Sequence, residues 1–138
     1  MANAEFAHRW FEEVWNKKSE AAVDEMLAAD GVGHGLPGGP IRGPEAFKEY
    51  QRQLIEAYPD LRVEVVDTVV EGDKIAARCR VTGAHQGDSL GIMATNNPVD
   101  FGGLVILHVR DGKIAEAWNE FNFTDMYKQL GLKALSLE

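Results

Sequence analysis

The sequence predicts an α+β fold in which helices come first and an antiparallel sheet follows. In roughly the first 60 residues, apolar side chains recur at the spacing of amphipathic helices, and from residue 61 onward they alternate with a period of two. Successive strands joined by short turns pair antiparallel, and the apolar face of such a sheet packs against helices. The chain of 138 residues has the length of one domain, which we expect to span residues 1–138.

Three helices are expected before the sheet. The second begins after Ser19, whose hydroxyl can accept a hydrogen bond from a backbone N–H of the first turn, and it ends near residue 30. The third begins at Gly43-Pro44, because proline suits the first helical position, and Pro59 ends it. The first helix carries a wide aromatic stripe formed by Phe6, Trp10, Phe11, Val14 and Trp15.

A short glycine-flanked strand that contains His34 is expected between the second and third helices. Four longer strands are expected in the rest of the chain, at residues 61–70, 74 to about 86, 99–110 and 113–122. The last two are joined by Asp111-Gly112, a dipeptide that supplies the positive φ angles of a tight hairpin turn. A final short helix is expected from a Thr124 cap to about residue 131.

Composition and charge exclude several classes of partner. The net charge is −8 and the acidic residues are spread along the chain, whereas binding to nucleic acid or to an anionic membrane needs clustered Lys and Arg. The single cysteine, Cys79, cannot form an internal disulfide, and no apolar run approaches the ~18 residues of a membrane span. Charges interrupt the N-terminal segment too early for a secretory signal. We therefore expect a cytoplasmic protein.

The hairpin at residues 108–122 resembles the signature of the SnoaL-like polyketide cyclases, a family of the NTF2-like superfamily. It contains a strand with His108, a DGK turn, an I-x-E-x-W segment ending at Trp118, and the polar residue Asn122. The resemblance extends from Phe6 to Gly131 and implies a cone, in which a curved antiparallel sheet packs against three to four helices. Where the family carries a catalytic aspartate, this chain carries Asn122.

The resemblance implies a cofactor-free enzyme that promotes an intramolecular aldol condensation, or a related reaction, of an apolar carbonyl compound. The amide of Asn122 can hold a carbonyl or a water by hydrogen bonds, but it cannot shuttle a proton. A base must then come from elsewhere, and His108 and His85 are the first candidates. Two alternatives remain: a non-catalytic ligand-binding protein that has lost the acid, and an isomerase, dehydratase or hydrolase on the same fold.

Strand parity and the resemblance together predict the site. We expect a mostly apolar cavity between the first and third helices and the sheet, with His108, His85 and Asn122 as its candidate catalytic residues. No metal site is expected, because the scattered histidines have no carboxylate partners at ligand spacing. The residues expected to bind the substrate are Trp118, His34, Trp15, Phe47, Tyr50, Met93 and Ile106.

The sequence also predicts a homodimer. Residues 104–109 (Leu-Val-Ile-Leu-His-Val) are apolar on both faces, whereas a sheet with one solvent-exposed face alternates. Because a few short helices can cover only one side, we expect the outer sheet faces to pair around Phe101, Val105, Leu107 and Phe121.

Overall fold

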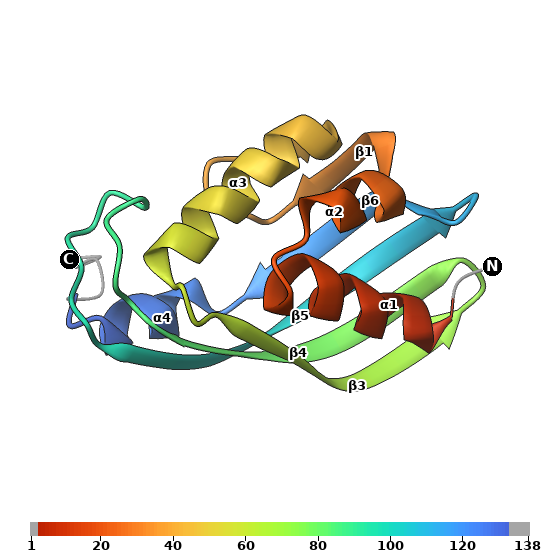
Figure 1. The fold of residues 1–138 in the computed structure, drawn as a ribbon. Helices are drawn as coiled ribbons and strands as arrows, with labels where there is room; N and C mark the ends of the chain where they lie inside the picture. Colours follow the sequence, from red (N-terminus) through yellow and green to blue (C-terminus); the bar gives the residue numbers. More distant parts are fainter. Residues whose placement is uncertain (1–2, 133–138) are drawn as a thin grey trace.

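The computed structural model describes residues 3–132 of the chain (Figure 1). The elements, in chain order, are α1 (Ala4–Trp10), the π-helical turn η1 (Phe11–Asn16), α2 (Glu20–Met26), β1 (Leu27–His34), β2 (Ile41–Arg42), α3 (Gly43–Ala57), β3 (Arg62–Glu71), β4 (Lys74–Ala84), β5 (Pro98–Arg110), β6 (Lys113–Phe121) and α4 (Phe123–Gln129).

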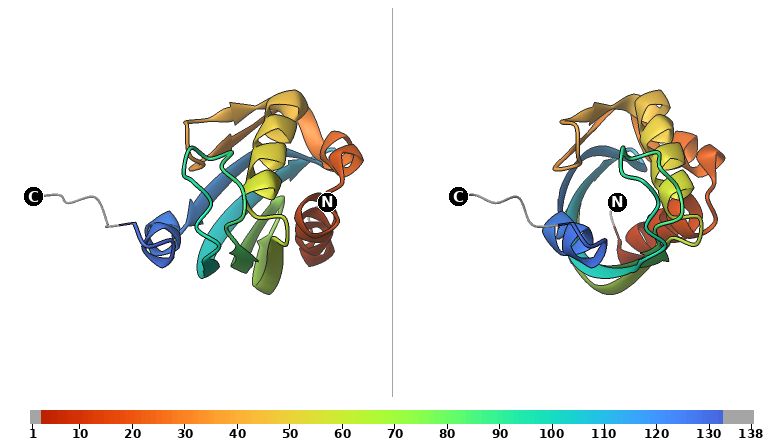
Figure 2. Two further views of the ribbon diagram at one scale, coloured as in Figure 1. Left: turned by 60° about the vertical axis from the view of Figure 1, so that its left-hand side comes forward. Right: turned by 90° about the vertical axis from the view of Figure 1, so that its left-hand side faces the viewer.

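The strands form one curved, six-stranded sheet in the order β2-β1-β6-β5-β4-β3. β1 runs parallel to β6, and the other neighbouring strands are antiparallel. α1, η1, α2 and α3 lie across the concave side, so that sheet and helices together enclose the interior (Figure 2). The predicted α+β cone is confirmed.

The first two strands of the sheet differ from the sequence prediction. The second helix was expected to reach residue 30, but α2 ends at Met26 and β1 begins at Leu27. Asp30 and Gly31, which resemble a helix end, lie instead in an irregular part of β1, where the register against β6 shifts between Leu27 and Val32. The two-residue strand β2 was not expected, because a strand this short carries no alternation.

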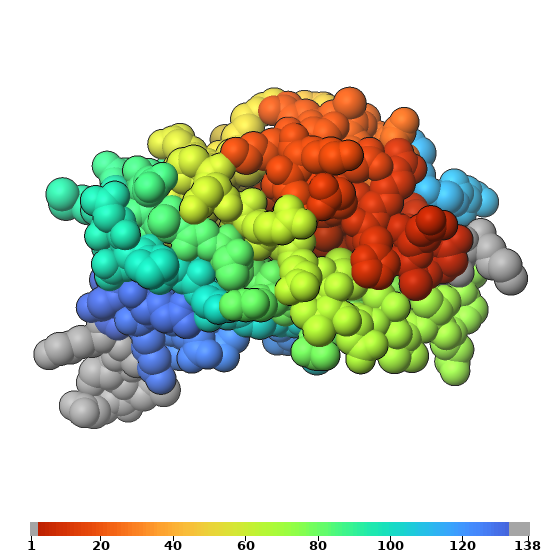
Figure 3. All heavy atoms as spheres, turned by 60° about the horizontal axis from the view of Figure 1, so that its bottom comes forward, coloured from red at the N-terminus to blue at the C-terminus, as the bar shows by residue number. Residues whose placement is uncertain are grey.

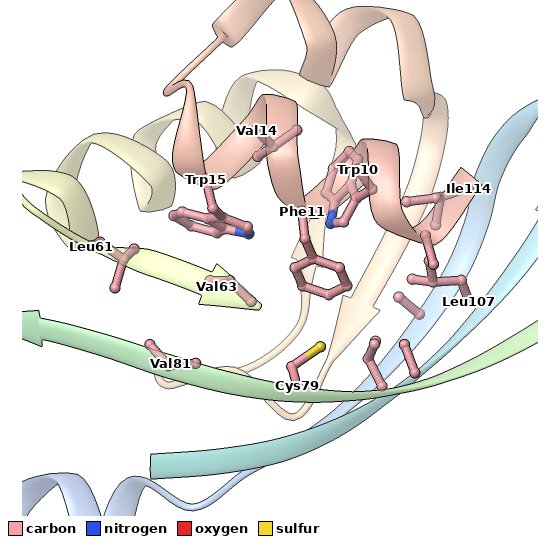
Figure 4. Packing of buried hydrophobic residues seen from close by; sticks show 14 of the residues in the cluster. Trp10, Phe11, Val14, Trp15, Leu61, Val63, Cys79, Val81, Leu107 and Ile114 are labelled. Carbon is pink, nitrogen blue, oxygen red and sulfur yellow. The ribbon is translucent and has the colours of Figure 1, made fainter. Parts of the chain in front are cut away.

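The first helix widens at η1. The N–H of Lys17 donates to the carbonyl of Glu12 over 2.8 Å, which is the i→i+5 bond of a π-helix. Residues five apart therefore come to the same side, and Trp10 and Trp15 both point from the helix toward the sheet, with 5% and 6% of their surface exposed (Figure 4). The wide turn explains why the aromatic stripe contains spacings of three to five residues.

Two side-chain amides join the helices to the rest of the fold. Asn16, at the end of η1, donates to the carbonyl of Val63 over 2.9 Å and accepts from its N–H over 2.7 Å, as a neighbouring strand would. Gln51 of α3 is fully buried and donates to the carbonyls of Val14, at 2.8 Å, and Ser19, at 3.3 Å. These bonds fix η1 against both β3 and α3.

Cys79 of β4 lies in the core beneath Phe11, as expected for a small apolar residue (Figure 4). Burial raises the pKa of its thiol to about 12. Within residues 3–132, no helix combines the length and apolar character that a membrane crossing requires.

We predict that Cys79 does not react with thiol reagents in the folded protein. Its thiol stays protonated well above its ordinary pKa, and the thiolate is the reactive form. The unfolded chain loses this proton at lower pH, so the group stabilises the fold below about pH 8.5 and the contribution declines as pH rises toward the folded pKa. Alkylation by iodoacetamide at pH 8, followed by mass spectrometry, should be slow in buffer and fast in urea. Equal rates would contradict the burial of Cys79.

Candidate functional site

An apolar cavity lies between the concave face of the sheet and the helices. The space that its walls leave open to a water-sized molecule is about 80 Å³. α1, η1 and α3 supply one wall, β3 to β6 supply the other, and α4 closes one end. The residues that line it are Trp10, Phe11, Trp15, Val32, Gly33, Leu36, Phe47, Tyr50, Leu54, Tyr58, Leu61, Val63, Val81, Val99, Phe101, Val105, Leu107, Ile114, Ala117, Asn119, Phe121, Phe123 and Met126.

Four aromatic rings form the helical wall of the cavity. Phe47 of α3 lies 5.3 Å from Trp10 and 5.8 Å from Trp15, measured between ring centroids. Tyr50 lies 5.9 Å from Trp15, almost perpendicular to it, and 6.1 Å from Phe47. These tilted and edge-on contacts are favourable for aromatic pairs. They hold the rings as a rigid surface suited to a flat, apolar ligand.

Asn119 places an amide on the opposite wall, where β6 meets β1. Its Nδ2 donates to the backbone carbonyl of His34 over 2.9 Å. Gly35 has a φ of +81°, and a Cβ on it would lie 1.9 Å from the carbonyl oxygen of Asn119. This close approach therefore requires glycine. The amide is held at the mouth of the cavity, beside Gly33 and Leu36.

Tyr58 lines the cavity at the end of α3, and His85 packs against it from the start of the loop between β4 and β5. The two rings lie 5.5 Å apart, and each residue is 1% exposed. Burial, with a smaller contribution from nearby Tyr127, raises the pKa of Tyr58 to about 12. The same two causes raise the pKa of Tyr50 further. Both phenols are therefore protonated hydrogen-bond donors at neutral pH.

The structure corrects the predicted positions of His108, Trp118 and Ile106, which lie on the outer face of the sheet. Trp118 is 37% exposed and Ile106 is 43% exposed. The inner face of β5 carries the other apolar set, Val99, Phe101, Val105, Leu107 and Val109.

A bulge in β6 explains why Trp118 faces outward instead of into the cavity. His108 pairs with Glu116, but the next residue of β5, Val109, pairs with Ile114, so Ala115 is an extra residue in β6. Ile114 consequently shares the inner face with Ala117 and Asn119. Ile114 and Trp118 therefore lie on opposite faces, although an unbroken alternation would place residues four apart on the same face.

His34 also lies on the outer face, where it forms a small cluster with Glu116 and Trp118. Its Nε2 is 2.6 Å from a carboxylate oxygen of Glu116, and its ring stacks on Trp118 with centroids 6.0 Å apart. Lys74 Nζ lies 6.0 Å from the centre of the Trp118 ring. The cluster is near the mouth, but its side chains are on the side of β1 and β6 that faces away from the cavity.

Asn122 and Met93 are outside the cavity as well. The side chain of Asn122 accepts a hydrogen bond from the N–H of Asp125 over 3.0 Å and is the N-cap of α4, the position that the sequence prediction gave to Thr124. Met93 is 82% exposed in the loop between β4 and β5.

Of the predicted site residues, the structure brings Trp15, Phe47 and Tyr50 together on the cavity wall, with His85 directly behind it. Their roles in binding stay predictions. The sequence analysis missed Asn119 and Tyr58. A correct parity for β6 would have found Asn119, since it directly follows an outward-facing tryptophan. No sequence signal singles out Tyr58.

An α+β cone around an apolar cavity defines a protein of the NTF2-like class. The model of the SnoaL-like polyketide cyclase family matches residues 5–130, and the chain belongs to this family.

Solved structures show the same similarity. A candidate polyketide cyclase from Bacillus cereus ATCC 10987 is 31% identical, with 92% of this chain and 78% of that chain covered and a TM-score of 0.78. IdmH, a candidate polyketide cyclase from Streptomyces antibioticus, is 29% identical over 94% of this chain and 98% of its own, with a TM-score of 0.80. TsrD from Streptomyces laurentii is 27% identical over 95% and 98%, with a TM-score of 0.82. A comparison with curated proteins finds no match.

We predict that Asn122 acts on stability through its cap. Asn122→Ala removes the acceptor for the N–H of Asp125 and should lower the free energy of unfolding by about 1 kcal/mol. Asn122→Asp, the matched control, keeps an acceptor at that position and should retain most of this energy. Urea denaturation of the three proteins measures the difference. Equal stabilities of wild type and Asn122→Ala would argue against the cap.

Proposed function

We propose that this protein binds an apolar, ring-containing carbonyl compound in the aromatic cavity and promotes its ring closure without a cofactor. The aromatic wall supports the proposal, because the cavity offers flat apolar surface and few polar groups. Membership of the polyketide cyclase family supports the reaction type.

In the proposed reaction, a base removes a proton from a carbon next to a carbonyl. The resulting enolate carbon attacks a second carbonyl of the same molecule, a carbon–carbon bond forms, and the new alkoxide takes up a proton. The cavity assists by holding the flexible chain folded, with the two reacting carbons close together. The amide of Asn119 and the hydroxyls of Tyr50 and Tyr58 can donate hydrogen bonds to the oxygen on which negative charge develops.

The proposed base differs from the one expected from the sequence, where His108 and His85 were the candidates. Among the residues of 3–132 that line the cavity, none is Asp, Glu, His or Lys. A carbon between two carbonyls is acidic enough for a weak base, so we propose that water entering at the mouth accepts this proton. The protein then contributes binding, orientation and hydrogen-bond donors.

The second candidate is a non-catalytic carrier or sensor of the same kind of ligand. The observation that favours it is that no carboxylate or imidazole of residues 3–132 lines the cavity wall. Both candidates require the same ligand site, and turnover separates them.

We predict that truncating the aromatic wall weakens binding, whereas truncating the outer tryptophan does not. Phe47→Ala removes a ring that contacts Trp10 and Trp15 and should weaken binding of the neutral dye phenylnaphthylamine by about tenfold. Trp118→Ala is the control, because Trp118 lies outside the cavity. Dye fluorescence gives the affinities, and circular dichroism checks that both variants are folded. A weaker dye complex in Trp118→Ala, with Phe47→Ala unaffected, would place the ligand elsewhere.

Turnover is measured with an acyclic triketone that bears an aryl group and has one carbon between two of its carbonyls. Its aldol product loses water to give a conjugated enone, which absorbs in the ultraviolet. The wild type should close the ring faster than buffer alone, and Asn119→Leu should lower the rate. Dye binding together with a rate no faster than buffer would favour the non-catalytic candidate.

We also propose that the outer sheet face pairs two copies of the chain. The residues first predicted for this interface, Phe101, Val105, Leu107 and Phe121, belong to the inner face, where they line the cavity. The outer face instead exposes large apolar side chains: Val66, Val69, Leu104, Ile106 and Trp118. Such a patch is typical of an interaction surface.

The corresponding prediction concerns Ile106, which is 43% exposed on the central strand β5. Ile106→Glu places a charge within the outer apolar face and should shift a dimer toward monomer at micromolar concentration. Met93→Glu, at an exposed loop position, is the control and should leave the mass unchanged. Sedimentation equilibrium measures both. A monomeric wild type would refute the dimer.

A further inference from the structure

Two buried polar atoms at one end of the cavity have no hydrogen-bond partner within residues 3–132: Tyr58 Oη and His85 Nε2. Buried polar groups are almost always paired, because leaving one unpaired loses the hydrogen bond it would make with water. The third unpaired atom, Gln51 Oε1, belongs to an amide whose nitrogen bonds the carbonyls of Val14 and Ser19 between the helices, whereas His85 packs directly against the wall residue Tyr58. Tyr58 and His85 thus form an isolated polar pair next to an apolar cavity.

The surroundings of His85 determine which of its nitrogens carries a proton. The backbone N–H of Thr95 donates to His85 Nδ1 over 3.2 Å, and the Thr95 hydroxyl, 3.1 Å from the same nitrogen, can also donate to it. Nδ1 is therefore an acceptor, and the neutral ring carries its proton on Nε2. The backbone of His85 is fixed as well, since its N–H donates to Asn97 at 3.0 Å and its carbonyl accepts from Asn96 at 2.8 Å. Nε2–H is a buried donor that has no acceptor.

Tyr58 supplies a second donor at the same place. Its N–H donates to the carbonyl of Leu54 over 2.9 Å and its carbonyl accepts from Leu61 at 2.9 Å, so the backbone holds the ring at the end of α3. The Tyr58 side chain lines the cavity, and its ring centre is 5.5 Å from that of His85.

The loop between β4 and β5 covers this end of the molecule beside α4 (Figure 3). It is anchored by Ser89, which donates to the carbonyl of Gln53 over 2.5 Å, and by the N–H of Gln86, which donates to the carbonyl of Ala57 over 2.8 Å. Within the loop, Asp88 accepts from the N–H of Ala94 over 2.7 Å. Asn97 reaches from the end of the loop to the carbonyl of Gln129 in α4, at 3.3 Å. The two donors are thus enclosed.

We propose that Tyr58 and His85 are the oxygen-binding end of the cavity, where they orient the ligand through a carbonyl oxygen. Tyr58 Oη donates to that oxygen, and the Nε2–H of His85 is the second donor of the pair. An oxygen acceptor fits because the Tyr58 hydroxyl and the Nε2–H of His85 each have a proton to donate, and a neutral oxygen fits because no cationic side chain lines the cavity in residues 3–132. The inference rests on the proposed function and deepens it by naming how the ligand is oriented.

The test uses two bicyclic ligands of nearly the same shape, tetralone and tetralin, which differ by one carbonyl oxygen. Affinities are measured by displacement of phenylnaphthylamine from the full-length protein. The wild type should bind tetralone more tightly than tetralin, by roughly fivefold to tenfold, the effect of one neutral hydrogen bond. Tyr58→Phe should abolish this preference and leave the affinity for tetralin unchanged.

Tyr127→Phe is the matched control, because it removes a hydroxyl near Tyr58 from a residue that does not line the cavity, and it should retain the preference for tetralone. A second readout is the NMR signal of the His85 Nε2 proton, which should shift with tetralone and stay in place with tetralin. A preference that persists in Tyr58→Phe, or that disappears only in Tyr127→Phe, would overturn the assignment. Failure of the wild type to bind the dye or either ligand would instead refute the proposed function.

Discussion

The wide helical turn at η1 is the constraint on which the cavity depends. Its i→i+5 bonding turns both Trp10 and Trp15 toward the sheet and brings Asn16 to the edge of β3, where it pairs with Val63. A regular α-helix would place residues five apart on different sides. Gln51 fixes the same turn to α3, so the large rings are held at the wall by their neighbours. The cavity therefore follows from how the helices are spaced over the sheet.

Much of this fold could be predicted from the sequence, since the change of period near residue 61, Pro44 and the Asp111-Gly112 turn each have a local physical cause. The sequence did not, however, predict which faces of β5 and β6 point into the cavity. In β5, the side chains on both faces of the strand are largely apolar, so the sequence does not show which face is buried. In β6, the extra residue Ala115 shifts the alternation, so that Ile114 faces inward and Trp118 faces outward. Glu116 and Glu120, which alternate with Trp118, could have shown that this face of β6 is exposed, because charged side chains are rarely buried. The predictions of α3 and of the hairpin between β5 and β6 agree with the structure, because neither depends on which face is buried.

The site residues divide in the same way. Trp15, Phe47 and Tyr50 were predictable because helical spacing places them on one apolar face. Asn122 was chosen from the family pattern, but its side chain is occupied by the cap of α4, and Asn119 is the amide that reaches the interior. The pairing of Tyr58 with His85 joins the end of a helix to a loop 27 positions later in the chain, and only the folded structure brings the two together. Long-range contacts of this kind have no local pattern.

The loop between β4 and β5 is tied to the rest of the molecule by a few polar bonds, from Gln86 and Gly87 to Ala57, from Ser89 to Gln53 and from Asn97 to Gln129. Its side chains Leu90 and Ile92 also pack against the core. The aromatic wall, by contrast, belongs to the packed helices, so a change of ring there alters the core and the proposed binding surface together. Exposed positions of the loop, such as Met93, can change with little effect on stability. An engineer can therefore lengthen or replace the tip of this loop and keep the scaffold that holds the cavity.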